Sequence, residues 1–161
     1  MASLEEILRS RDERASRQRE LKDSFTGKAL LSLTVIVPGP EKRTETSLNV
    51  AAAAVSAIRD AFHIVHEELR DLSTGYEAFF IVPGDDYDAK RKAVEIEETH
   101  PFGRLFDIDV IGQEGPLSRK DVGAEERRCL ICGKTARECM RLRTHSPEEL
   151  TEAVRRIVTR R

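Results

Sequence analysis

Asp107 and Asp109 lie two residues apart inside a run of β-branched and aromatic residues, and this run predicts a strand from Leu105 to Ile111. Because side chains alternate along a strand, both carboxylates are expected on one face. Two close carboxylates repel each other and lose hydration, so such a pair is expected on a solvated face or beside a cation. The pattern therefore has two interpretations: the polar outer face of an edge strand, or a magnesium site that binds a polyphosphate.

Small and basic residues flank this strand on both sides. A glycine lets another backbone or a ligand approach closely, and the cations could neutralise phosphate charge. The candidate substrate-binding residues around the strand are Gly103, Arg104, Ser118, Arg119 and Lys120. His100 precedes them, and it is either a general base or a residue that only shapes the turn before the strand. Acids flanked by bases favour the interpretation in which a metal-bound polyphosphate is held here.

The segment from His100 to Val110, HPFGRLFDIDV, resembles the signature of the apo-citrate lyase phosphoribosyl-dephospho-CoA transferases, also called holo-citrate lyase synthases. Three other stretches agree with this resemblance, and they occur in order along the chain: SRDER at 10–14, VIVPGP at 35–40, and RRCLIC at 127–132 with Cys139 and His145. The resemblance runs from about residue 4 to residue 145. Four motifs in order are far more specific than any one of them.

This resemblance implies an enzyme of the nucleotidyltransferase type. It would transfer the phosphoribosyl-dephospho-CoA group from triphosphoribosyl-dephospho-CoA to a serine of the citrate lyase acyl-carrier (gamma) subunit, with release of pyrophosphate. We accordingly assign Asp107 and Asp109 to catalysis through Mg²⁺, with His100 as the candidate base. The SRDER stretch adds Arg11 and Arg14 to the candidate substrate-binding residues.

Two other functions remain open at this point. One is a nucleotidyltransferase that acts on another carrier protein or on a small molecule. The other is a non-catalytic, zinc-dependent adaptor organised by the cysteine cluster. Stoichiometric zinc without magnesium-dependent pyrophosphate release would favour the adaptor.

The cysteine cluster comprises Cys129, Cys132, Cys139 and the nearby His145. Three thiols and an imidazole are a ligand set suited to tetrahedral zinc, although the spacing is not that of a common zinc finger. The alternatives are a structural zinc site and plain reduced cysteines. With either, we expect the cluster to be structural and remote from the chemistry.

The composition describes a globular chain with nearly balanced charge. Of 161 residues, 39% are hydrophobic and 35% are charged, with 27 basic and 29 acidic side chains and no Trp, which argues against nucleic-acid binding. We expect one transferase domain over residues 1–161, with a cysteine-containing helical segment at about 122–161. The sequence shows neither a signal peptide nor a membrane span, so we expect a cytoplasmic protein with no membrane partner.

Hydrophobic periodicity predicts alternating helices and strands. Helices are predicted at 4–22, 44–69, 85–99 and from Pro147 onward, and strands at 29–37, 77–83 and 105–111. The expected fold class is α/β, with α+β as the alternative. It would be a nucleotidyltransferase-like sheet of about three to five strands with helices packed on it and strand 29–37 at its centre. His63 and His66 fall on the second predicted helix and are left out of the site.

The first predicted helix carries five arginines, at positions 9, 11, 14, 17 and 19. They could form an anion clamp or a docking surface for an acidic partner such as a carrier protein. The alternative is a solvated helix face with Glu–Arg pairs.

Overall fold

A single antiparallel sheet with strand order β2-β3-β1-β4-β5 is the framework of the protein, and the computed structural model describes residues 1–159. The strands are β1 (Ala29–Val35), β2 (His66–Leu72), β3 (Gly75–Val82), β4 (Phe106–Gly112) and β5 (Gly115–Pro116). The helices are α1 (Leu4–Ser24), α2 (Glu45–Ala61), α3 (Asp86–Thr99), α4 (Ala136–Leu142) and α5 (Pro147–Thr159). Short 3-10 turns occur at Gly103–Leu105 and Arg119–Val122. The mixed α/β class and the central position of β1 confirm the prediction.

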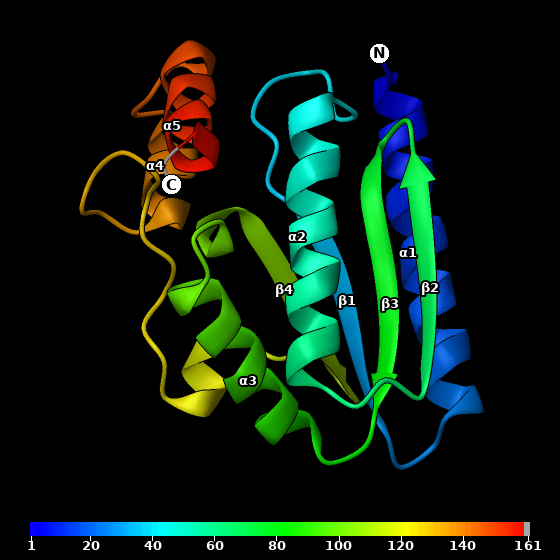
Figure 1. The fold of residues 1–161 in the computed structure, drawn as a ribbon. Coiled ribbons are helices and arrows are strands. Elements are labelled where there is room, and N and C mark those ends of the chain that lie inside the picture. Colours follow the sequence, from blue (N-terminus) through cyan, green and yellow to red (C-terminus); the bar gives the residue numbers. More distant parts are fainter. Residues whose placement is uncertain (160–161) are drawn as a thin grey trace.

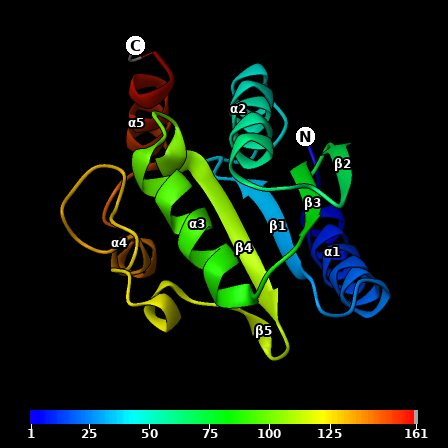
Figure 2. The ribbon, with the colours of Figure 1, turned by 60° about the horizontal axis from the view of Figure 1, so that its bottom comes forward.

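The helices form a layer on each side of the sheet. Figures 1 and 2 show α2 and α3 on one face and α1 on the other. Alternating side chains of β1 pack on opposite faces of the sheet. Leu31 and Leu33 belong to the core beneath α2 and α3, whereas Leu30 packs with Leu21 of α1. Fully buried side chains of this size each contribute about 1.5–3 kcal/mol through burial. The burial of β1 on both faces is therefore what makes it the central strand.

The face of the sheet beneath α1 changes from apolar to polar along β1. After Leu30 come Ser32 and Thr34, and these two residues pair in register with Asp109 and Asp107 of β4. The Gln18 amide of α1 donates to the Ser32 hydroxyl oxygen at 2.9 Å. The acidic pair therefore lies on the α1 face, at the polar end of that face.

The second predicted helix, 44–69, is wrong beyond Ala61. Phe62 leaves the helical conformation, and residues 66–72 form β2, which pairs along its length with β3. The spacing of Phe62 and Val65 continues the helical pattern, but Gly75, with a φ of 125°, closes a tight turn that places β2 beside β3. Tertiary pairing therefore overrides the local pattern.

The two histidines expected on this helix lie outside it. His63 lies in the loop between α2 and β2, and His66 lies on β2 with its Nε2 2.9 Å from Glu68.

Side-chain caps fix the starts of the helices that were predicted correctly. Thr44 and Ser47 form a reciprocal capping box at α2, and the Asp85 carboxylate accepts from the Asp88 amide at α3. These bonds satisfy backbone amides that have no partner within the helix. None of the described helices is both long and apolar enough to cross a bilayer.

Candidate active site

The two aspartates of β4 line a cavity of about 620 Å³ that Lys90 and Glu97 of α3 also border. Phe106, Ile108 and Val110 are fully buried on the opposite side, so the predicted alternation of acids and apolar residues is confirmed. The cavity is also lined by basic side chains from four segments: Lys90, Arg119, Lys120, Arg127 and Arg137. Two further acids, Glu97 and Glu126, line it as well, so the structure places the pair of aspartates in a cavity of mixed charge.

The charge on the aspartate pair is only weakly compensated by the protein. Burial and the neighbouring charge of Asp107 raise the pKa of Asp109 to about 6, although the charges of Lys90 and Arg14 act in the opposite direction. Within residues 1–159, neither aspartate forms an ion pair or accepts a side-chain hydrogen bond. An added cation could therefore bind here and favour the ionised form.

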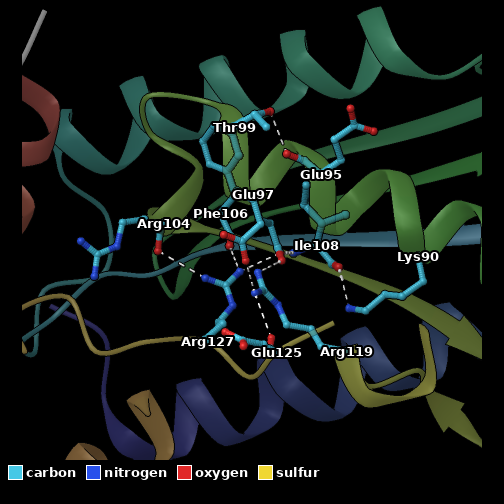
Figure 3. Close-up of polar contacts among 11 residues, drawn as sticks. Lys90, Glu95, Glu97, Thr99, Arg104, Phe106, Ile108, Arg119, Glu125 and Arg127 are labelled. Atoms are coloured by element: carbon cyan, nitrogen blue, oxygen red, sulfur yellow. Dashed lines mark hydrogen bonds and ion pairs between the residues drawn. The ribbon is translucent and has the colours of Figure 1, made fainter. Parts of the chain in front are cut away.

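Glu97 of α3, by contrast, is a fully compensated acid beside the same strand. It is 4% exposed; its Oε1 lies 2.8 Å from Arg119, and its Oε2 lies 2.6 Å from Arg127 and accepts from the Ile108 amide at 2.9 Å. Figure 3 shows the two arginines converging on this carboxylate. This arrangement satisfies a buried charge inside the protein.

Beyond the short strand β5, the outer edge of β4 is covered by side chains and not by another strand. The Arg127 guanidinium donates to the Phe106 carbonyl, and the Lys90 ammonium donates to the Ile108 carbonyl at 3.4 Å (Figure 3). Beyond them, the Leu117 amide donates to the Val110 carbonyl at 2.9 Å. Exposed strand edges promote unwanted pairing, and here charged side chains take the place of a partner strand.

Ser118, Arg119 and Lys120 all line the cavity, but their surroundings differ. Arg119 is held by Glu97 and, at 2.5 Å, by Glu98, which raises its pKa despite burial. Ser118 caps the 3-10 turn that carries Arg119 and Lys120. Of the two cations in this turn, Lys120 is the one that no described ion pair occupies.

Gly103 and Arg104 lie at the entry to β4 and make structural contacts. A Cβ on Gly103 would lie 2.2 Å from the Glu97 carbonyl oxygen, so only glycine allows this turn to pack on the end of α3. The Arg104 guanidinium donates to the Cys129 carbonyl at 2.5 Å. Arg104 also lines a second cavity, described below.

His100 shapes the turn before β4. Its Nδ1 accepts from the Phe102 amide at 2.9 Å, and its ring packs 4.8 Å from that of Phe106. Burial lowers the pKa of this imidazole. Among the described residues that line the cavity with the two aspartates, His100 does not occur.

The α1 arginines point partly toward the sheet. Arg14 lies 3.3 Å from Glu77, and Arg17 lies 2.5 Å from Glu68. These contacts use the charge of Arg14 and Arg17 inside the molecule, an arrangement that neither sequence interpretation of the helix anticipated. Burial is the main cause that lowers the pKa of Lys42, and the charge of the nearby Arg11 lowers it further.

A second cavity of about 440 Å³ adjoins the first and shares Asp107 and Arg127 with it. Its other walls are mainly apolar and come from the loop after β1 and from the cysteine segment: Ile36, Val37, Pro38, Leu130, Met140 and Leu150. The loop after β1 therefore lies beside Asp107 of the acidic strand. Cys129 and Cys139 line the same cavity, so the expectation that the cluster is remote from the acidic strand is wrong. The C-terminal segment folds back over the start of β4.

The four predicted metal ligands do come together. The ligand atoms of Cys129, Cys132, Cys139 and His145 all lie within 4.8 Å of one another. The neighbouring His145 imidazole is the main cause that lowers the pKa of the Cys132 thiol, to about 6, whereas burial raises that of Cys139 to about 11. The cluster could hold a metal ion such as zinc.

Three charged residues of the site, Lys90, Glu97 and Arg127, were not singled out from the sequence. Lys90 and Glu97 are seven residues apart on α3, on the same helix face as the buried Ala93. A charged residue on an apolar face is the signal that could have identified them, because burial of an unpaired charge is costly. Their partner Arg127 lies in the RRCLIC stretch at 127–132, but no local pattern indicates that this distant segment meets α3.

Two aspartates on one strand face, without an ion-pair partner among the described residues and in a cavity that basic side chains also line, form a site that could hold a hard cation. Residues 2–161 match the family model described as apo-citrate lyase phosphoribosyl-dephospho-CoA transferase. A protein of that name from Citrobacter koseri is 39% identical over 155 residues, which cover 92% of this chain and 84% of the relative.

Two further relatives agree. A Streptococcus pyogenes protein named for the same transferase is 38% identical, with 96% of this chain and 84% of the relative covered. One from Escherichia coli is 35% identical, with 96% and 86% covered. The chain belongs to the apo-citrate lyase phosphoribosyl-dephospho-CoA transferase family.

Proposed function

We propose that this protein transfers the phosphoribosyl-dephospho-CoA group from triphosphoribosyl-dephospho-CoA to a serine of the citrate lyase acyl-carrier subunit. The serine oxygen forms a bond to the phosphorus nearest the ribose. The bond from that phosphorus to the bridging oxygen breaks, pyrophosphate leaves, and the serine proton passes to a base or to water. Family membership supports this reaction, and the residues of the cavity suit it chemically.

The observation that carries the proposal is the uncompensated charge of Asp107 and Asp109. Glu68, Glu77 and Glu97 also lie at the sheet, and each is held by at least one arginine. The aspartate pair instead faces a cavity that Lys90 and Lys120 also line, and burial and repulsion raise the pKa of Asp109. A pair of this kind is suited to an external cation and a phosphate ligand.

Mg²⁺ is the cation that we propose for Asp107 and Asp109. When bound, it would neutralise charge on the triphosphate as pyrophosphate leaves. Lys120 faces the same cavity without a described ion pair and would contact phosphate oxygens, while Ser118 fixes the turn that presents it. Arg119 and Arg104 would add positive potential from their structural positions. Arg14 would do so from α1, since its charge already lowers the pKa of Asp109.

Of the two roles open to His100, we propose the positioning role. Its Nδ1 is occupied by the Phe102 amide, and its ring supports the first residue of β4. Gly103 has the same kind of role, because it allows the turn to approach α3. Arg11 remains a candidate phosphate ligand because of its place in the SRDER motif.

We further propose that the metal of the cysteine cluster is zinc and that the protein acts in the cytoplasm. A reducing compartment keeps three thiols available as metal ligands. Residues 1–161 would then form one transferase domain in which the segment at about 122–161 folds around the cluster.

The direct test is incubation with the apo carrier subunit, triphosphoribosyl-dephospho-CoA and Mg²⁺, followed by intact-mass spectrometry of the carrier. We expect a mass gain of one prosthetic group with release of pyrophosphate, and neither in excess EDTA. A carrier whose target serine is replaced by alanine is the matched control. An unchanged carrier mass, with pyrophosphate formed only with another acceptor, would point to the alternative nucleotidyltransferase. No reaction with any acceptor would favour the adaptor.

A further inference from the structure

We propose that a zinc ion bound by Cys129, Cys132, Cys139 and His145 fastens the C-terminal segment across the start of β4, and that it thereby positions Arg104 and Arg127 beside Asp107. The metal site itself depends only on the geometry of its ligands. The effect on catalysis rests on the proposed function, and it is tested separately.

The spacing of the donors suits one tetrahedral ion. The Sγ atoms of Cys132 and Cys139 are 3.4 Å apart, and no ligand pair exceeds 4.8 Å. With Zn–S bonds of about 2.3 Å, tetrahedral geometry places two sulfurs about 3.8 Å apart. The four ligands therefore require only small shifts to coordinate zinc.

His145 provides independent evidence for a ligand. Its Nε2 atom is buried and has no hydrogen-bond partner among the described residues. Its Nδ1 faces the Glu149 carboxylate at 3.8 Å. Metal-binding histidines commonly present one nitrogen to the ion and the other to a carboxylate or carbonyl. A zinc ion would satisfy the unpartnered atom and leave Glu149 to orient the ring.

The backbone around the cluster is arranged like a metal-binding turn. The Cys129 amide donates to the Lys134 carbonyl at 2.8 Å, which closes a loop that presents Cys132. Cys139 lies on α4, and the Thr144 amide donates to the Cys139 carbonyl at 3.1 Å just before His145. Three separate parts of the segment therefore meet at one point, in a region with few buried apolar side chains. Small units of this kind often depend on a metal for stability.

Two contacts connect the cluster to the acidic strand. The Arg104 guanidinium donates to the carbonyl of Cys129 itself at 2.5 Å. Arg127 lies two residues before Cys129, and it bonds both Glu97 and the Phe106 carbonyl next to Asp107. Release of Cys129 would therefore loosen the side chains that cover the edge of β4. This makes the zinc ligands positioning residues and not catalytic ones.

The test begins with metal content. Protein purified without chelator should contain about one zinc per chain, and Cys132→Ser should lose most of it. Leu142→Ser is the control, because Leu142 is exposed on α4, the helix that carries Cys139, and is not a ligand. Replacement of zinc by Co²⁺ should give the visible bands of a tetrahedral thiolate site. Wild-type protein that takes up neither metal would overturn the proposal.

The second measurement is hydrogen–deuterium exchange with and without zinc, on the wild-type chain so that no variant needs to fold. Zinc removal should accelerate exchange at 104–108 and 125–135 and leave the amides of β3 unchanged. Metal removal with unchanged exchange at 104–108 would refute the proposed link. Neither measurement needs substrate, so failure of the proposed transfer reaction would leave them intact.

If the transfer reaction is confirmed, zinc removal should slow it about 100-fold, as expected for displaced active-site groups, and added zinc should restore it. Full activity in zinc-free protein would overturn the positioning role.

Discussion

Two acidic groups border β4, and the protein treats them in opposite ways. Glu97 lies at the outer edge of the strand, where two arginines and a backbone amide neutralise it. Asp107 and Asp109 lie on the α1 face, where they have no such partner among residues 1–159 and where the pKa of Asp109 rises to about 6. Glu97 therefore belongs to the scaffold, whereas the aspartates keep a charge that only an external cation or a proton can neutralise.

This difference between compensated and uncompensated acids is visible in the structure and not in the sequence. The acids have similar neighbours in the chain, with arginines and lysines nearby. In the structure, Arg119, Arg14 and Arg17 form ion pairs with Glu97, Glu77 and Glu68. The two aspartates form no such pair among the described residues and line the cavity. Charge that a fold leaves uncompensated in a cavity is the better indicator of a site.

The largest effect is expected from removal of the compensated acid. Glu97→Ala leaves two arginines and the Ile108 amide without their partner, so it should lower the free energy of unfolding by about 3–5 kcal/mol. Glu98→Ala is the control, because the Glu98 side chain is 60% exposed and should cost at most about 1 kcal/mol. Urea denaturation measures both variants. Equal losses would show that Glu97 is no more important to the scaffold than a surface acid.

Gly103→Ala tests the packing that brings Glu97 to the strand. The new Cβ would lie 2.2 Å from the Glu97 carbonyl oxygen and 2.7 Å from that of Ile96, and backbone cannot easily move away. A loss of about 1–3 kcal/mol is expected, as for an overpacked core. Gly133→Ala is the matched control, because a Cβ there meets no atom within 4 Å. A melting temperature equal to that of the control would show that the turn is looser than described.

Asp109→Asn should raise the free energy of unfolding in metal-free buffer, whereas the two preceding substitutions should lower it. The folded-state pKa, about 6, lies above the ordinary value of 3.8, so ionisation disfavours the folded state. That penalty is complete above pH 6 and absent below about pH 4. The variant should therefore be more stable than wild type by about 3 kcal/mol at pH 8 and equal to it near pH 4. Asp60→Asn, at an exposed position of α2, should show no such difference. A destabilised Asp109→Asn protein at pH 8 would contradict the account of the charge.

Arg17→Gln should lower the free energy of unfolding by a smaller amount, and it should do so at neutral pH and not at low pH. Hydrogen bonds from Arg17 are the main cause that lowers the pKa of Glu68 to about 2. A depressed carboxylate pKa contributes stability above about pH 4.5, and this stability is lost as the pH falls toward 2. We expect a loss of about 1 kcal/mol at pH 7, because the pair is partly exposed, and little difference near pH 2. A constant loss across this range would mean that packing and not charge is responsible.

The sequence was sufficient for features that depend on local pattern. The alternation at Asp107 and Asp109 and the burial of β1 follow from short-range rules, and both are confirmed. The gathering of the four cysteine and histidine ligands was anticipated from residue types and not from spacing.

The remaining features depend on which distant segments meet. β2 has a helix-like sequence but pairs with β3 through a tight turn. The roles of Arg119 and Arg127 are set by Glu97, a residue on a different element. The position of the cysteine cluster beside the acidic strand results from the return of the chain over β4 after residue 122. No local periodicity encodes such contacts.

The most direct test of the central claim is the rate of transfer to the apo carrier subunit by Asp107→Asn and Asp109→Asn across a Mg²⁺ titration, followed by intact mass. Both variants should fold, and each should transfer at least about 100-fold more slowly than wild type at every Mg²⁺ concentration. Transfer near the wild-type rate by either variant in saturating Mg²⁺ would contradict the assignment of the uncompensated pair to the metal.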